Sequence, residues 1–104
     1  MLFHVTMTHS EDNCPAYSRE KQAEFIAAAD KLDALAKELN VKVHNLLWGA
    51  PEHVAYALVE ADSVGAVGRF VMSFPFRQDF KVTPVQHLQG VVTMIKAMMT
   101  QSQK

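Results

Sequence analysis

Residues 2–15 read LFHVTMTHSEDNCP, and the change of pattern within them decides the fold. Over the first part, apolar and polar side chains alternate, with Phe3, Val5 and Met7 on one side and His4, Thr6 and Thr8 on the other. A period of two is typical of a β-strand with one apolar face. Ser10–Pro15 breaks the alternation and holds the only cysteine. A strand at this position is expected to need neighbours on both sides, so the sequence predicts a central strand.

The rest of the chain predicts three more strands and three helices. Apolar residues at steps of three and four indicate helices, and short apolar runs next to turn residues indicate strands. The expected elements are a helix over Arg19–Leu39 capped by Ser18, strands Val41–Trp48 and His53–Ala61, a helix from Val64 to about Ser73, a strand over Gln78–Val85, and a helix from about Leu88 to Thr100. Thr83 and Pro84 also fit a helix start, so the last strand–helix boundary stays open between residues 83 and 88.

This order of elements predicts a ferredoxin-like βαββαβ domain over residues 1–104, of class α+β, with an added C-terminal helix. The expected sheet is antiparallel with strand order 4-1-3-2. Pro84 agrees with an edge position for the fourth strand, because proline cannot donate to a sheet. Two helices cover one sheet face, and the other face needs a cover. The C-terminal helix and a second copy of the chain are the two candidates.

Composition excludes several classes of function. The chain has 104 residues, 49% of them hydrophobic, and a formal net charge of -1, which argues against nucleic-acid binding. No stretch approaches the roughly 18 apolar residues of a membrane span. A single cysteine fits a reducing compartment, so we expect a cytoplasmic protein without membrane attachment. Motifs for nucleotide binding or standard hydrolysis are absent.

Two segments resemble the dimeric α+β barrel superfamily. Residues 59–71 (VEADSVGAVGRFV) are similar to the passage from third strand to second helix, and residues 82–85 (VTPV) resemble the proline-bearing fourth strand. The resemblance covers roughly residues 1–86. It implies a homodimer with two sheets face to face and a pocket between sheet and helices. The group includes small-molecule monooxygenases and isomerases, but the resemblance transfers no catalytic residue to this chain.

Several residues are candidates for ligand binding. His4 and Thr6 lie on the mixed face of the first strand, where His4 is the candidate general base. His44 and Trp48 share one side of the second strand by parity, and Tyr56 lies on the third. Arg77 follows a group of phenylalanines and suits an anionic ligand. The predicted ligand-binding set is His4, Thr6, His44, Trp48, Tyr56 and Arg77.

His9 and Cys14 are the candidate metal ligands. Imidazole and thiolate donors suit a transition metal such as Zn, Cu or Fe. A reactive thiolate is the alternative role for Cys14, because helix N-termini favour the thiolate.

These observations predict a homodimer, or a higher oligomer, that binds a small molecule. The hypothesis includes a cofactor-independent enzyme acting on a small apolar or aromatic substrate. The alternative is a metal-binding or metal-sensing module that uses His9, Cys14 and His4. The first hypothesis needs no cofactor, and the second needs a transition metal.

Overall fold

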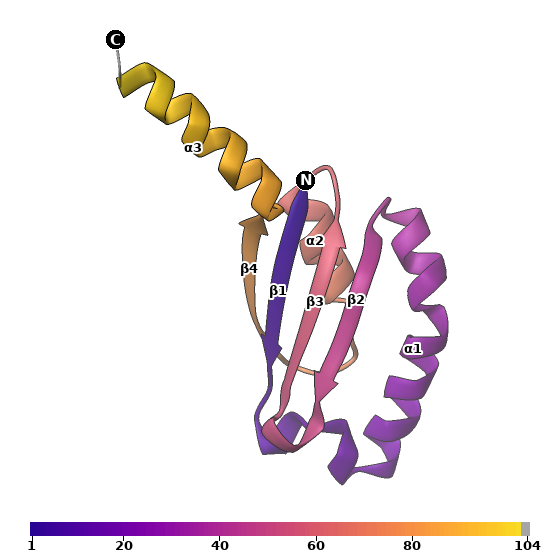
Figure 1. Ribbon diagram of the computed structural model, residues 1–104. Helices are drawn as coiled ribbons and strands as arrows, with labels where there is room; N and C mark the ends of the chain where they lie inside the picture. Colours follow the sequence, from indigo (N-terminus) through magenta and orange to yellow (C-terminus); the bar gives the residue numbers. More distant parts are fainter. Residues whose placement is uncertain (103–104) are drawn as a thin grey trace.

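A computed structural model describes residues 1–102 and contains one four-stranded sheet and three α-helices within them (Figure 1). The elements are β1 (Leu2–Thr8), α1 (Arg19–Glu38), β2 (Lys42–Gly49), β3 (Val54–Glu60), α2 (Val64–Val71), β4 (Asp79–Val85) and α3 (Leu88–Ser102). Three single 3₁₀ turns lie between them, namely η1 (Glu11–Asn13), η2 (Pro15–Tyr17) and η3 (Ala50–Glu52).

The sheet has the order β2-β3-β1-β4, and every neighbouring pair is antiparallel, which confirms the predicted ferredoxin-like topology. The central pair runs from Leu2 opposite Glu60 to Thr8 opposite Val54. Pro84 lies in β4 opposite Phe3, on an edge strand, as predicted. Because β4 continues to Val85, the alternative helix start at Thr83 and Pro84 is wrong.

The core lies between the sheet and the helices. Residues on one face of the central strands are buried, namely Phe3, Val5, Met7, Ala55, Ala57 and Val59. From α2, Val67, Phe70 and Val71 complete this core. Figure 1 looks onto the opposite sheet face, and α2 lies behind the strands. The alternation of β1 therefore separates a helix-covered face from an open face, as the sequence predicts.

Helix α1 begins and ends where the sequence indicates. The hydroxyl of Ser18 accepts a hydrogen bond from the backbone N–H of Lys21 at 3.4 Å. Asn40 stops the helix with φ of 57°, a left-handed conformation that asparagine tolerates. Of the α1 side chains only Ala36 is buried, while Phe25 and Leu32 pack half-buried against the core. The N-terminal half of this helix therefore stands off the sheet.

A β-bulge in β2 overturns one prediction. Val43 pairs with Val59, but the next pair joins Asn45 to Leu58, so the strand contains one extra residue. The extra residue reverses the sheet face toward which each later side chain of β2 points. His44 and Trp48, predicted to share a side, therefore point to opposite faces.

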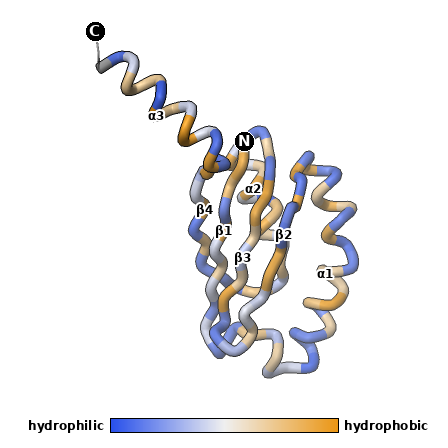
Figure 2. Tube along the Cα trace, viewed as in Figure 1, coloured by the Kyte–Doolittle hydropathy of each residue, from blue (hydrophilic) through white to orange (hydrophobic). Residues whose placement is uncertain are grey.

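Helix α3 does not cover the open sheet face of its own chain. It projects away from the sheet beyond the end of β4 (Figure 1). Figure 2 shows apolar positions along the projecting helix. Five large apolar residues of α3 are exposed, namely Leu88, Met94, Ile95, Met98 and Met99. On the open face, Leu47 is 61% exposed and Tyr56 is 41% exposed. None of the described helices, α3 included, is long and apolar enough to cross a membrane.

Two valines of α2 test the placement of the core. Val67 is fully buried and Val64 is 59% exposed, on the same short helix. Val67→Ala is expected to lower the free energy of unfolding by about 1.5–3 kcal/mol, because buried apolar area is lost and a cavity remains. Val64→Ala is the matched control, with an expected change within about 0.5 kcal/mol. Urea unfolding measures both, and equal effects would contradict the orientation of α2.

Candidate functional site

An apolar cavity of about 580 Å³ lies between α1, the η2 turn and strand β2. Ala29 and Leu32 line it from α1, Leu46 and Trp48 line it from β2, and Tyr17 lines it from η2. The volume falls within the range of small-molecule sites, roughly 300–1,000 Å³. The cavity exists because α1 between Gln22 and Leu32 stands off the sheet and includes the small residue Ala29.

Aromatic side chains form one wall of this cavity. The Trp48 ring meets Phe25 edge-on at 5.3 Å between centroids, and Phe74 edge-on at 5.6 Å. Phe76, which does not itself line the cavity, packs against this wall, 5.9 Å from Phe25 and 5.1 Å from the His9 ring. Edge-to-face packing of this kind fixes ring positions. The cavity therefore has a rigid aromatic side that ends at a histidine.

His9 and His53 meet at one end of the cavity. His9 directly follows Thr8 and His53 directly precedes Val54, and these two neighbours are the last pair of the β1–β3 ladder. The His9 backbone N–H donates to the His53 carbonyl at 3.2 Å. His9 Nε2 and His53 Nδ1 lie 3.3 Å apart, so one nitrogen donates its proton to the other. The register of the central strands thus creates an imidazole pair.

Cys14 completes a group of three donors at this end. It is a buried, free cysteine between η1 and η2. One donor atom from each of His9, Cys14 and His53 lies within 4.8 Å of the other two. All three residues line the apolar cavity. The loop after β1 therefore folds back and places the thiol beside the imidazole pair.

Burial changes the acid–base behaviour of His9. Desolvation, and after it the charge of His53, hold the pKa of His9 below its ordinary value. The Nδ1 atom of His9 is buried and has no hydrogen-bond partner in the described part of the chain. His9 therefore favours the neutral imidazole, which retains one nitrogen lone pair.

The structure separates the predicted site residues into groups. Trp48 lines the cavity, beside the two candidate metal ligands His9 and Cys14. His4 and Tyr56 lie on the open face with ring centroids 6.1 Å apart, and Thr6, opposite Tyr56, shares that face. Arg77 is exposed in the loop before β4 and does not line the cavity. The predicted set therefore does not form one site.

His44 also belongs to the open face. Its Nε2 lies 3.2 Å from a carboxylate oxygen of Glu60, the residue opposite Leu2 on β1. This hydrogen bond holds the pKa of Glu60 below its usual range. The bulge at His44 thus directs the ring to a neighbouring carboxylate and away from Trp48.

Sequence reasoning missed His53 as a member of the site. The sequence indicates a turn at residues 49–52, and a histidine next to a turn is usually solvated. In the structure His53 adopts a left-handed conformation with φ of 57° after η3, which turns its ring toward His9. The predicted topology already contained the information needed to find His53. Antiparallel pairing of the first and third strands brings the end of the first, at His9, to the start of the third, at His53.

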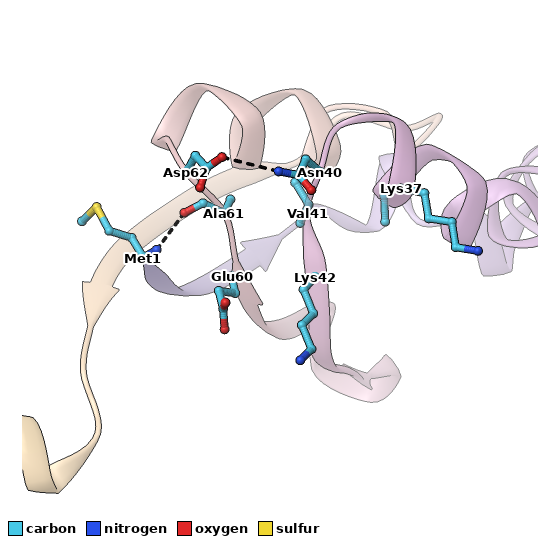
Figure 3. A pocket seen from close by; sticks show the side chains of 9 residues that line it. Met1, Lys37, Asn40, Val41, Lys42, Glu60, Ala61 and Asp62 are labelled. Carbon is cyan, nitrogen blue, oxygen red and sulfur yellow. Dashed lines mark hydrogen bonds between the residues drawn. The ribbon is translucent and has the colours of Figure 1, made fainter.

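A second cavity, of about 490 Å³, lies at the opposite end of the sheet (Figure 3). Its walls carry charges of both signs, from Lys37, Lys42, Glu60 and Asp62. Hydrogen bonds join the wall segments, from the Met1 nitrogen to the carbonyl of Ala61 at 2.9 Å and from Asn40 to Asp62 at 3.4 Å. These bonds give the region a structural role in tying three chain segments together.

The lowered pKa of His9 predicts a pH-dependent stability. Between the ordinary histidine pKa and the lower value in the folded chain, the unfolded chain binds more protons than the folded one. The free energy of unfolding should therefore fall as the pH drops through this window, and His9 should contribute no pH dependence above it. Urea unfolding of wild type and His9→Gln across pH, in the presence of a chelator, measures the difference. A pH dependence unchanged by His9→Gln would contradict the prediction.

The solved structures that resemble this chain include two that are informative here. SCO4226 from Streptomyces coelicolor A3(2) matches with a TM-score of 0.55 and 16% identity, covering 82% of this chain and 96% of that one, a likeness of fold alone. A muconolactone isomerase matches with a TM-score of 0.55 and 27% identity, covering 85% of this chain and 92% of that one. No curated protein matches this chain. The two structures agree with the predicted α+β barrel fold.

One family matches almost the whole chain. It is described as Domain of unknown function (DUF3303), and its match spans residues 1–99. The matched range includes the sheet, α1, α2 and the three donors at the cavity. The chain therefore belongs to the DUF3303 family.

Proposed function

We propose that this protein binds a small, mainly apolar or aromatic organic molecule in the cavity between α1 and the sheet, and that it acts as a homodimer. The observation that carries the proposal is the cavity itself, about 580 Å³ with a mostly apolar lining. Small-molecule sites combine such a lining with a few polar groups that orient the ligand. Here the polar groups gather at one end, as His9, Cys14 and His53.

The comparison with muconolactone isomerase supports the same class of ligand. That enzyme is 27% identical over most of both chains, and its name describes the isomerisation of a lactone, a small organic molecule. A neutral imidazole beside an apolar cavity is suited to proton transfer on a bound molecule. Turnover by this chain without a cofactor is therefore part of the proposal, with His9 as the group at the cavity end.

The homodimer is supported by two exposed apolar surfaces on one chain. The open sheet face presents Leu47 and Tyr56, and the projecting α3 presents Ile95 and other apolar residues. Exposed apolar patches of several hundred Å² mark interaction sites. A second copy related by two-fold symmetry can cover each surface with its own, since an isologous contact uses the same patches on both chains. Such a dimer would enclose His4 and Thr6 between the two sheets. There the two side chains could contact a ligand held between the sheets.

Filling the cavity should abolish binding of an apolar probe. Trp48 is the only tryptophan of the chain and lies on the cavity wall, so 1-anilinonaphthalene-8-sulfonate bound there quenches its fluorescence. Ala29→Phe places a ring in the cavity and should weaken binding about 10-fold or more, a change of about 1.4 kcal/mol or greater. Ala23→Phe, on an exposed position of the same helix, is the matched control. Equal binding by both variants would refute the cavity as the ligand site.

A charge on the open face should separate the proposed dimer. Leu47→Glu adds a carboxylate to an exposed position of β2, so the fold of the single chain should be unaffected. At micromolar concentration, light scattering after size exclusion is expected to give a dimer mass for wild type and a monomer mass for Leu47→Glu. Met72→Glu, which is exposed at the end of α2 on the other side of the sheet, should remain dimeric. A monomeric wild type would sink this part of the proposal.

A further inference from the structure

Three potential metal ligands meet at one end of the apolar cavity. His9 comes from the end of β1, Cys14 from the loop between η1 and η2, and His53 from the turn before β3. Cys14 is buried, and the two histidines are half-buried. The donor atoms come together because backbone hydrogen bonds fix their segments, from His9 to His53 and from Cys14 to Glu11.

We propose that His9, Cys14 and His53 bind one Zn²⁺ ion, with the remaining coordination position facing the cavity. Imidazole nitrogen and thiolate sulfur are both donor types that zinc takes in proteins. Three protein ligands leave one position of a tetrahedral ion for water or a bound molecule. Because all three residues line the cavity, that position is reached from within it.

The distances between the donors fit a single ion. Nitrogen ligands about 2.0–2.1 Å from a tetrahedral Zn²⁺ lie about 3.3–3.4 Å from each other. The His9 Nε2 and His53 Nδ1 atoms are 3.3 Å apart. A thiolate about 2.3 Å from the same ion would lie about 3.6 Å from each nitrogen. All three donor atoms lie within 4.8 Å of one another, so a small side-chain adjustment would close the site around one ion.

Unsatisfied polar atoms gather at this same end of the sheet. In the described part of the chain, only His9 and Gln78 contain buried side-chain polar atoms without a hydrogen-bond partner. Gln78 directly precedes Asp79, which pairs with Thr8, so it lies at the same end of β1 as His9. Buried polar atoms without partners are rare in native proteins, and a bound water or ion is one explanation for them. A metal-bound histidine usually donates its other ring N–H to an acceptor. The amide oxygen of Gln78 is an unpaired acceptor at this end of the sheet.

The chemistry of the lining favours zinc over Mg²⁺ and Ca²⁺. Among the described residues no carboxylate lines the cavity, and those two ions take oxygen ligands. A copper site with two histidines and a cysteine would add a weak axial methionine, glutamine or backbone oxygen, and Gln22 is the one such side chain among the described lining residues. A tetrahedral Zn²⁺ needs no axial ligand of this kind. One thiolate leaves a site charge of +1 with Zn²⁺ bound. That charge would favour a cavity ligand with an oxygen donor or carboxylate at one end and an apolar body along α1.

This inference is separate from the proposed ligand binding, because an ion can bind these residues with no organic molecule in the cavity. With zinc bound, His9 would serve as a metal ligand and not as the proton-transfer group. Its test therefore uses the metal alone. The purified protein is stripped with a chelator and titrated with Co²⁺, which replaces Zn²⁺ and is visible by absorption. A thiolate-to-Co²⁺ charge-transfer band, saturating at one ion per chain, is the expected result. Because Cys14 is the only cysteine, this band identifies the ligand without any variant.

Variants and calorimetry with Zn²⁺ complete the test. Cys14→Ser and His53→Gln should each weaken Zn²⁺ binding by about 100-fold or more, because even outer-shell partners are worth roughly 10–100-fold. His87→Gln, an exposed histidine outside the group, should bind like wild type. Circular dichroism shows whether each variant keeps its fold. Absence of the charge-transfer band in wild type, or binding that is unchanged by Cys14→Ser, would overturn the proposal.

Discussion

The antiparallel pairing of β1 with β3 is the constraint on which the other features depend. It runs over seven residue pairs in the centre of the sheet, from Leu2 opposite Glu60 to Thr8 opposite Val54. One face of this ladder supplies the buried core, and its end brings His9 and His53 together. A shift of one residue would turn the core side chains to the open face and would separate the two imidazoles. The fold and the candidate site therefore share one register.

The cavity follows from how α1 meets that sheet. A helix of 20 residues spans about 30 Å and crosses the length of the sheet. It touches the core through Phe25 and Leu32, while the side chain between them, Ala29, is too short to reach. The aromatic rings of Trp48 and Phe74 line the opposite wall. The cavity therefore results from the small size of the Ala29 side chain. A bound molecule could fill it and pack against both walls.

The sequence predicts the fold well, because the relevant signals are local. The alternation in residues 2–8, the Ser18 cap and the proline of the fourth strand each depend on near neighbours, and they help to establish the order of elements from which the strand order is inferred. The site was harder to predict. The bulge between Val43 and Asn45 leaves no clear mark in the sequence. It nevertheless places Trp48 on the helix-covered face of the sheet and His44 on the open face. His53 belongs to the site only through its cross-strand contact with His9. It can be predicted only when the residue register of the first and third strands is considered together with the order of the strands in the sheet.

The most direct measurement is a crystal structure of the protein grown with Zn²⁺, with anomalous data collected at the zinc absorption edge. It tests the register, the cavity and the donor group in one experiment. The predicted result is a single anomalous peak between His9, Cys14 and His53, at the end of the β1–β3 ladder and open to the cavity beside α1. A structure in which these three side chains lie apart, or in which zinc binds elsewhere on the chain, would contradict the claim that the central pairing builds the site.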